Sequence, residues 1–527
     1  MSATPSPPKL RPYQVQLIKD LYQTLGMGYH RVAIIAGTGA GKTVIAGQIC
    51  AHAEARGCRL LFLVHLDVLV GQTFEKMEAF GLHCGFIKAG WKEDPSAPIQ
   101  IASVQTMAKR NWWRKWKADV VLYDEAHTTV FSQVGQQLIY RTHPDATHLA
   151  LTATPYRLGK EQLGDHMETL VSSPVPSELQ RMGFLAPMKY YGMPLENQID
   201  LEGVRTVGGD FDERDLKIAC DRPELVQRIV EEWLRLTPDK RTIAFCVDVE
   251  HARHVADAFN QAGISADTVE GNTPIKERHR LYRALRDEEI LVLTSCKVIS
   301  IGFDEPSVEV GLLLRPTQSR ALHFQQIGRV MRISPKTDKL HGTILDQAGN
   351  LKRLGFPEDI QSYSLPTSAE PEGSGRIPSK QCPCCGRVVW IFVMTCPECE
   401  HHWTNEAQIP LEDLAEVLSE EQFLMVQGYE MQRAFHDLRK LHYQKGASPA
   451  WTTRKFFEQF NCLPKDAWCQ GSIFGKHPTP EDKYNYKTYL THLAQRQGKS
   501  ISWVISEFQK EFGSADWQAI FFDQKSS

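Results

Sequence analysis

Three features are missing from the 527-residue sequence, and each absence narrows the function. There is no run of 18 or more apolar residues, so we expect neither a membrane-spanning helix nor a membrane partner. The N-terminus, MSATPSPPKL, lacks the basic and apolar regions of a signal peptide, so we expect a cytoplasmic protein with reduced thiols. The net charge is only −3, so any contact with nucleic acid would depend on local basic patches.

Short β-branched runs alternate with helix-like stretches in two series, which predicts an α/β protein. Near-continuous apolar strands, each followed by an amphipathic segment, are typical of a parallel sheet with helices on both faces. The first series occupies about 31–155 and the second begins near 241. The polar, glycine-containing stretch 195–216 is expected to link the two.

These patterns divide the chain into six expected regions. They are a first lobe at 1–175, an inter-lobe connection at 176–222, a second lobe at 223–355, a flexible linker rich in Pro, Ser and Gly at 356–380, a four-cysteine module at 381–403 and a helical tail at 404–527. The tail contains a weak repeat, because 446–460 and 498–512 share Gly, Ser, Trp and Phe at matching positions. Two small helical units with core aromatics are favoured over aromatics presented to DNA.

A glycine-rich stretch, AGTGAGKT at 36–43, separates an apolar run from a helix-like one. Such a turn points backbone N–H groups at a phosphate chain, and the following helix adds positive potential. Lys42 would reach the terminal phosphates of ATP, and Thr43 would hold Mg²⁺. Ala36 stands where the usual pattern has its first glycine, a position that mainly begins the turn. The residues expected to hold the nucleotide here are Gly37, Thr38, Gly39, Ala40, Gly41, Lys42 and Thr43.

The second half of such a site requires carboxylates at the end of a strand, and VVLYDEAH provides them. Asp124 would act on Mg²⁺, and Glu125 would polarise the attacking water. We expect His127 to connect the site to the neighbouring lobe. Transition-state charge on the γ-phosphate also requires an arginine from outside the loop, and Arg329 and Arg332 lie on one face of a predicted helix.

Four cysteines form two C-x-x-C pairs separated by ten residues: Cys382, Cys385, Cys396 and Cys399. This spacing predicts a closed four-thiolate Zn²⁺ site with a structural role, a zinc ribbon, in preference to buried free thiols. The ribbon would either contact DNA or a protein partner, or simply stabilise the fold. Cys384 lies between two of the ligands, and the spacing favours Cys385 over it.

Together these features resemble the superfamily-two helicases and translocases, with their motifs in the family's order over about 10–350. The resemblance implies two tandem RecA-like parallel-sheet lobes, followed here by the small zinc ribbon and an α-helical C-terminal region. LRPYQ resembles the Q-motif, in which Gln14 would recognise adenine and Arg11 would stack on it. LVHLDVLVGQ resembles motif Ia, although Leu66 stands where relatives often have Arg or Lys. ASVQTM resembles the next strand-contacting motif, and LTATPYR resembles motif III.

The second series carries the remaining motifs of this family. SIGFDEP resembles motif V, from which Gly302 and Asp304 would contact the nucleotide. QQIGRVMR resembles motif VI, in which Gln325, Arg329 and Arg332 would face the γ-phosphate. The resemblance therefore implies an ATP- and Mg²⁺-dependent nucleic-acid motor.

Within this superfamily, the sequence most resembles the RadD-like and UvsW-like group, which is associated with DNA repair. The stretches that carry this resemblance are RPYQ, TATPYRLGK, GFDEP and LRPTQSRALHFQQIGRVMR. That similarity implies a helicase or translocase acting on single-stranded, forked or branched DNA, with a possible protein partner at the zinc ribbon or helical tail. Three alternatives stay open: a motor subunit of a restriction or phage-defence system, an RNA helicase, and a scaffold with an idle motor. A basic, tryptophan-rich stretch at 111–117 either stacks on bases or packs on the first lobe, and packing is favoured.

Overall fold

The computed structural model describes most of the chain up to residue 403. The described residues are 8–403 without 66, 195–197, 297–304, 335–336, 338, 370–376, 392 and 394, together with 435, 438–439, 452–453, 455–456, 483, 486–487, 489–491 and 501–512. The chain divides into two compact units, 1–408 and 409–527. Leu66, Gly302 and Asp304 lie outside the described residues, as does most of the first tail repeat.

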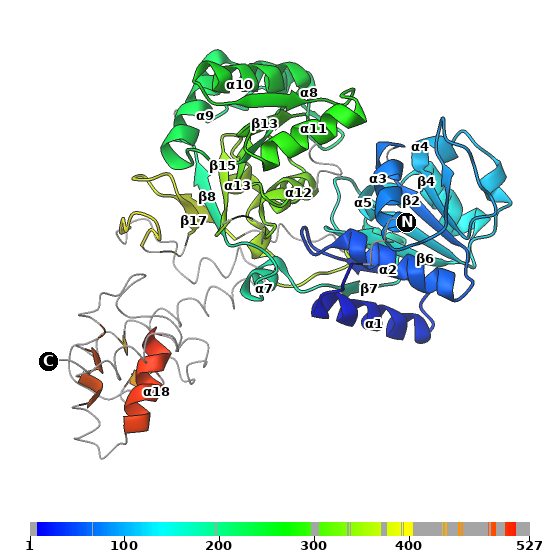
Figure 1. Ribbon diagram of the computed structural model, residues 1–527, viewed down its shortest axis with the longest axis horizontal. Helices are drawn as coiled ribbons and strands as arrows, with labels where there is room; N and C mark the ends of the chain where they lie inside the picture. Colours follow the sequence, from blue (N-terminus) through cyan, green and yellow to red (C-terminus); the bar gives the residue numbers. More distant parts are fainter. Residues whose placement is uncertain are drawn as a thin grey trace. The chain divides into compact units, whose positions relative to one another are not determined.

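The first lobe is built on a seven-stranded sheet whose order is β3-β4-β2-β5-β6-β1-β7. Figure 1 shows this lobe, with β2, β4, β6 and β7 labelled. The strands are β1 (Arg31–Ile35), β2 (Leu60–Val64), β3 (Cys84–Ile87), β4 (Ile99–Ser103), β5 (Val120–Asp124), β6 (Thr147–Thr152) and β7 (Thr169–Ser172). All of its neighbouring strands pair in parallel. The carboxyl ends of the strands therefore share one edge, where ligands bind in open parallel sheets.

Helices cover both faces of this sheet, because successive side chains of a strand point to opposite faces. Val32 and Ile34 pack with α1 (Pro12–Gly26), α2 (Lys42–Ala55) and α3 (Asp67–Glu78). Ala33 and Ile35 face the other layer. That layer consists of α4 (Val104–Met107), η1 (Trp112–Arg114), α5 (Ala126–Thr129), α6 (Gln133–Gln137) and η2 (Leu138–Thr142).

The tryptophans of 111–117 belong to this second layer. Trp113 is 1% exposed, and its indole N–H donates to the backbone oxygen of Met107 at 2.9 Å. Trp116 is also buried, and its indole N–H donates to the oxygen of Pro95 at 3.0 Å. The packing interpretation of this stretch is therefore confirmed.

The second lobe has a six-stranded sheet of order β12-β13-β11-β14-β15-β8, again with parallel pairing throughout. Its strands are β8 (Met188–Gly192), β11 (Thr242–Phe245), β12 (Ala266–Val269), β13 (Val292–Ser295), β14 (Val310–Leu313) and β15 (Gly342–Asp346). Two helices pack on one face, α9 (Pro223–Leu236) and α10 (Val249–Gln261). On the other face lie α11 (Ile275–Arg286) and α12 (Arg320–Val330). The prediction of two parallel-sheet α/β lobes is confirmed.

The stretch 176–222, expected to be a connection, contains parts of the second lobe. After α7 (Pro176–Arg181), the edge strand β8 pairs with β15. The short hairpin of β9 (Thr206–Val207) and β10 (Asp210–Phe211) follows, and then α8 (Glu213–Cys220). Asp210 accepts hydrogen bonds from the Thr317 hydroxyl (2.9 Å) and from the N–H of Gln318 (2.7 Å), which fixes the hairpin to the lobe.

The segment after α13 (Asn350–Leu354) and η5 (Pro357–Asp359), expected to be a flexible linker, makes ordered contacts with both lobes. Phe356 and Ile360 are buried, and Ile360 packs between Phe324 and Val175. Further along, the Pro366 oxygen accepts from the N–H of Gly164 at 2.8 Å. The chain thus returns from the second lobe to the first over 356–369.

In the tail, α18 (Ile501–Phe512) corresponds to the second repeat. Phe456 of the first repeat and Phe508 of the second are fully buried, which agrees with aromatics that form a core. None of the helices that the structure describes combines the length and apolar character of a membrane-crossing segment.

Candidate functional site

A cavity of about 380 Å³ lies at the carboxyl edge of the first sheet, and residues of the second lobe form its opposite wall. It contains most of the residues that the sequence predicts for a nucleotide site. Those lining it are Arg11, Thr38, Gly39, Gly41, Lys42, Thr43, Asp124, Glu125, Gln325, Arg329 and Arg332. Residues more than 300 positions apart in the chain therefore face one space.

The glycine-rich turn requires its glycine at Gly41, which has a left-handed conformation with φ of +80° immediately before α2. A side chain there would also collide with Gln14, since an added Cβ would lie 2.5 Å from its Nε2 atom. The left-handed backbone is the stronger of the two constraints, because the Gln14 amide is the end of a flexible side chain and could move aside. The turn therefore delivers Lys42 and Thr43 to the first turn of α2, at the positive end of the helix.

Gln14 and Tyr13 fasten the start of α1 to this turn. The Gln14 side chain donates to the Ala40 oxygen at 2.9 Å and accepts from the Arg11 N–H at 2.9 Å. The Tyr13 hydroxyl donates to the same Ala40 oxygen at 3.0 Å. Gln14 therefore fixes the glycine-rich turn to the start of α1, and it is not among the residues that line the cavity.

Phe184 is a site residue that no motif or spacing in the sequence indicates. It lines the cavity, and the guanidinium of Arg11 lies over its ring at 5.1 Å from the centroid. Its ring also packs edge-on against Tyr13, with 5.0 Å between centroids. Arg11 and Phe184 together form a flat, cationic wall suited to a purine.

Glu125 is the point at which the two lobes meet. Its carboxylate pairs with the Lys42 ammonium at 3.2 Å and accepts from the Gln325 side-chain amide at 3.2 Å. Burial opposes its ionisation, but Lys42, His127 and Arg329 together lower the pKa of Glu125 below its usual range. Its backbone has φ of +46°, a left-handed conformation that costs about 1–2 kcal/mol for a residue other than glycine. Strain of this kind persists where the surrounding structure requires it.

Asp124 is half-buried at the end of β5, and its carboxylate accepts from the N–H of Glu125 at 3.0 Å. Burial, reinforced by the neighbouring Glu125 charge, raises the pKa of Asp124 to about 6. Thr43 and Asp124 line the same cavity, and a hydroxyl and a carboxylate are hard oxygen donors of the type that Mg²⁺ prefers. The donor set therefore fits this metal.

The contact of His127 differs from the expectation that it reaches the second lobe. Its Nδ1 atom lies 3.1 Å from the Thr152 hydroxyl and 3.6 Å from the Glu125 carboxylate, both in the first lobe. The Thr152 hydroxyl donates to the Thr154 oxygen at 2.8 Å. His127 thus connects the end of β5 to the end of β6 within the first lobe. The contact of Glu125 with the second lobe is made by Gln325 instead.

Gly328 on α12 lies against Thr38 of the phosphate-binding turn. A Cβ added at Gly328 would overlap the Thr38 side chain, so the two lobes can approach here only because this residue is glycine. We expect Gly328→Ala to lower the rate of ATP hydrolysis by about 100-fold, because it holds α12 away from the phosphates. ATP affinity should change by less than about threefold, since the turn itself is intact.

Steady-state kinetics and nucleotide-binding titrations would measure both effects. Gly26→Ala is the matched control, because no atom lies within 4 Å of the position that its Cβ would occupy. Normal hydrolysis by Gly328→Ala would show that the lobes do not need this close approach.

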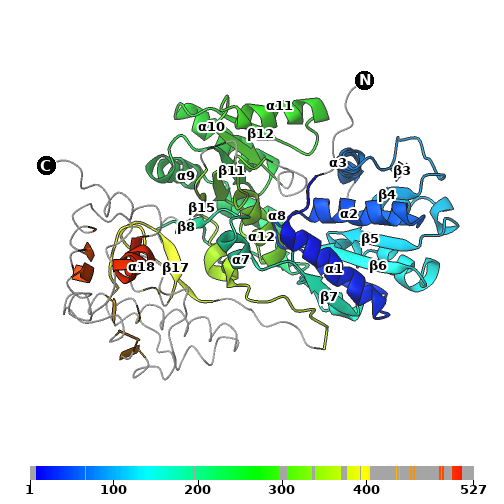
Figure 2. The ribbon, with the colours of Figure 1, turned by 60° about the horizontal axis from the view of Figure 1, so that its bottom comes forward.

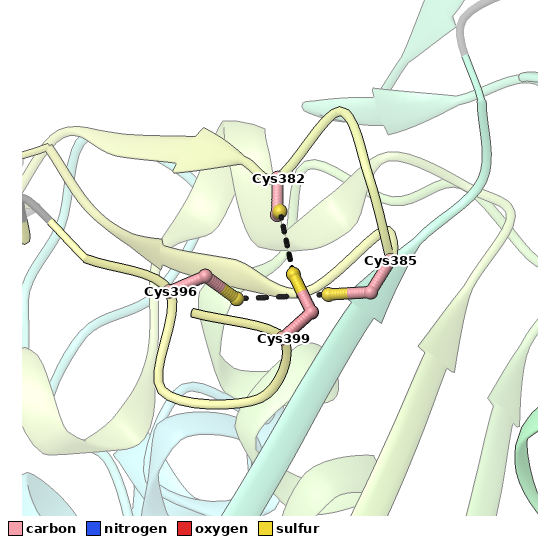
Figure 3. A group of neighbouring side chains, drawn as sticks. All are labelled: Cys382, Cys385, Cys396 and Cys399. Carbon is pink, nitrogen blue, oxygen red and sulfur yellow. Dashed lines mark hydrogen bonds between the residues drawn. The ribbon is translucent and has the colours of Figure 1, made fainter. Parts of the chain in front are cut away.

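Four sulfur atoms form a separate cluster in the described part of the chain. The Sγ atoms of Cys382, Cys385, Cys396 and Cys399 lie within 4.8 Å of one another, and they point to a common centre in Figure 3. Cys382 to Cys399 and Cys385 to Cys396 are both 3.6 Å. A tetrahedral Zn²⁺ with bonds of about 2.3 Å places its sulfurs about 3.8 Å apart, so the geometry fits this ion. Cys384 is exposed and is not among the four.

The cysteine module is attached to the free edge of the second sheet. Its hairpin of β16 (Ser379–Gln381) and β17 (Val388–Trp390) lies beside β8 (Figure 2). The N–H of Gly192 donates to the Gly386 oxygen at 3.0 Å, and the Gln381 side chain donates to the Gly192 oxygen at 2.8 Å. Arg387 donates to the Met188 oxygen at 3.1 Å. The module therefore covers edge groups of β8 that are otherwise open to a foreign strand.

Family models match both lobes. Residues 7–157 match "Type III restriction enzyme, res subunit", and 223–334 match "Helicase conserved C-terminal domain". Together the two matches indicate a nucleic-acid-dependent ATPase of the helicase class. The two-lobed sheet architecture and the cavity between the lobes agree with that class.

Three curated relatives are 25–28% identical to the chain over the aligned residues. A 51.5 kDa protein of Lactococcus phage (isolate 7-9) is 28% identical, covering 70% of this chain and 77% of the relative. A type I restriction enzyme EcoAI endonuclease subunit of Escherichia coli is also 28% identical, covering 69% and 50%. The DNA 3'-5' helicase XPB of Kineococcus radiotolerans is 25% identical, covering 63% and 58%. The chain thus spans only about half of the latter two relatives.

A solved structure has the same fold. It is a fragment described as an HsdR subunit of a type I restriction enzyme from Vibrio vulnificus YJ016. The match has a TM-score of 0.52 and 21% identity, and it covers 67% of each chain.

Proposed function

We propose that this protein is an ATP-driven motor that moves along DNA or remodels it. The observation that carries the proposal is the position of Glu125, whose carboxylate contacts Lys42 in one lobe and Gln325 in the other. Because residues of both lobes form the site, it is complete only when the cleft between the lobes is closed. ATP binding would therefore close the cleft, and hydrolysis would let it open.

The roles of the residues follow from the cavity. Lys42 would bind the terminal phosphates, and Arg329 and Arg332 would stabilise the charge that develops on the γ-phosphate. Glu125 would orient the attacking water and accept its proton. Thr43 and Asp124 would hold Mg²⁺, which supplies charge neutralisation of the phosphate oxygens. Arg11 and Phe184 would hold the base, and Gln14 would position Arg11 through its backbone N–H.

DNA is proposed as the substrate in preference to RNA. The named relatives include a DNA helicase, and DEAH differs from the motif II of DEAD-box RNA helicases. The RadD-like and UvsW-like group is resembled by RPYQ, TATPYRLGK, GFDEP and LRPTQSRALHFQQIGRVMR. This likeness supports activity on forked or branched DNA in repair. Contacts to the DNA backbone would give little sequence specificity.

The test is steady-state ATP hydrolysis with no nucleic acid, single-stranded DNA, duplex DNA, forked DNA or single-stranded RNA. We expect DNA to stimulate hydrolysis by about 5- to 150-fold, the range of a site-to-site coupling of 1–3 kcal/mol. The DNA concentration for half-maximal stimulation should rise steeply with salt, because backbone contacts release counterions. Stimulation by RNA alone would overturn the choice of DNA, and no stimulation would favour the scaffold.

A motor subunit of a restriction or phage-defence complex is the second candidate. It is favoured by the family match over 7–157 and by the fold shared with a restriction-enzyme fragment. This candidate requires a nuclease on another chain. ATP-dependent DNA cleavage by a purified complex, and none by this chain alone, would support it over a repair motor.

We also propose that the four-cysteine cluster holds one Zn²⁺ and that its role is structural. Four thiolates fill a tetrahedral site and leave no position for a reacting water. The contacts with β8 support a function in the second lobe itself.

A further inference from the structure

A partly buried lysine joins two motifs of the second lobe. The ammonium of Lys339 donates to three backbone oxygens, those of Pro306 at 3.3 Å, Val308 at 2.5 Å and Val330 at 2.7 Å. An ammonium has three hydrogens and no acceptor, so the three carbonyls satisfy it completely. A buried charge is tolerated only with partners of this kind.

The three oxygens belong to two functional segments. Pro306 ends the SIGFDEP motif, and Val308 follows it. Val330 is the last residue of α12, between Arg329 and Arg332. A cation at the carboxyl end of a helix is also favoured by the helix dipole. Lys339 therefore fastens the end of the arginine-bearing helix to the chain that leaves motif V.

We propose that Lys339 is a positioning residue for hydrolysis, which holds Arg329 and Arg332 at the distance that the γ-phosphate requires. It does not line the nucleotide cavity, so it acts through the backbone of α12. This inference rests on the proposed ATPase function. It predicts an effect on the hydrolysis step and not on nucleotide affinity.

The charges around Lys339 make its protonation relevant. Burial lowers the pKa of Lys339 to about 7; Glu309 opposes this change, and Arg332 and Arg241 add to it. Glu309 is itself held by Arg241 at 3.1 Å and by Lys240 at 2.9 Å. A neutral amine has only two hydrogens for three acceptors, and its lone pair would face a carbonyl oxygen. The attachment should thus weaken as the pH rises through about 7.

The test compares Lys339→Met with Lys240→Met. Methionine preserves the length and apolar stem of lysine but donates no hydrogen bond. Lys240 also contacts Glu309, but its side chain is 51% exposed, which makes it the matched control. We expect Lys339→Met to lower kcat by about 10- to 100-fold, as for a lost transition-state contact, with KM for ATP within about threefold. Lys240→Met should leave both unchanged.

A second variant, Lys339→Gln, retains two donors and does not titrate. We expect an intermediate kcat whose ratio to the wild-type value rises with pH between about 6 and 8, since only the wild type loses a proton there. Thermal unfolding and the fraction of protein that binds nucleotide would correct kcat for loss of folded protein. A purely structural role would reduce that fraction and leave kcat per folded molecule unchanged.

Several results would overturn the proposal. They are a normal kcat in Lys339→Met, a pH-independent ratio for Lys339→Gln, or failure of both variants to fold, which would make Lys339 a folding determinant. Wild-type protein without ATPase activity on any nucleic acid would overturn the proposed function together with this inference. An active wild type with an unaffected Lys339→Met would remove the inference alone.

Discussion

Glu125→Gln is expected to reduce DNA-stimulated ATP hydrolysis by about 10²–10⁴-fold, the contribution of a well-placed general base. Glutamine has the shape of glutamate and can still accept hydrogen bonds from Lys42 and Gln325, so the lobes should close on ATP as before. It cannot take a proton from water and lacks the negative charge that pairs with Lys42. The measurement is kcat at saturating DNA, with ATP affinity determined by titration.

Two further variants are compared with Glu125→Gln in this experiment. Lys42→Ala removes a phosphate contact and leaves Glu125 without its ion pair, so we expect weaker ATP binding as well as slower hydrolysis. Glu78→Gln, an exposed position near the end of α3, makes the same chemical change outside the cavity and should have no effect. If Glu125→Gln kept more than about a tenth of the wild-type kcat, another group would have to be the base.

The parts of the site that local sequence encodes could be predicted. The turn at 36–43 and the carboxylates at 124–125 each lie at the end of an apolar strand, and parallel pairing brings those ends to one edge. Phe184 could not be found in this way, because a single aromatic residue in a loop has no periodicity or spacing that marks it. Its place beside Arg11 results from packing between distant segments.

Two segments show why composition misleads at lobe boundaries. The strand MKYYG at β8 is buried on only part of its length, so it lacks the continuous apolar run that marks the central strands. Its pairing with β15, some 150 residues later, is determined by tertiary packing and not by the local sequence. Likewise, the many Pro, Ser and Gly residues of 356–380 suggest a linker. The same stretch also contains Phe356, Ile360 and Tyr363, which pack on the lobes.

Loss of the cysteine cluster is expected to have the other large effect, on stability. Structural Zn²⁺ contributes about 10–16 kcal/mol to the folding of zinc-finger peptides. If about 3 kcal/mol of this free energy stabilises the second lobe through the contacts with β8, loss of the metal would lower the unfolding midpoint of the lobe by roughly 6–12 °C. This follows from a shift of about 2–4 °C per kcal/mol. The uncovered edge of β8 should also promote aggregation on heating.

The experiment compares Cys385→Ser with Cys384→Ser. These neighbouring cysteines differ in that only the Cys385 sulfur lies in the cluster, whereas Cys384 is exposed. We expect one equivalent of zinc in the wild type and in Cys384→Ser, and loss of the metal with a lower midpoint in Cys385→Ser. The Trp390 indole donates to Asp359 at 2.7 Å, and the chain has 11 tryptophans, so the fluorescence difference between each protein and its Trp390→Phe form would report release of the module from the lobe. Equal zinc content and equal unfolding midpoints in the two variants would contradict a zinc-bound cysteine module that stabilises the second sheet. Zinc loss without a change in the midpoint would instead make the module energetically independent of the motor, and a contact with DNA or a partner would become its main role.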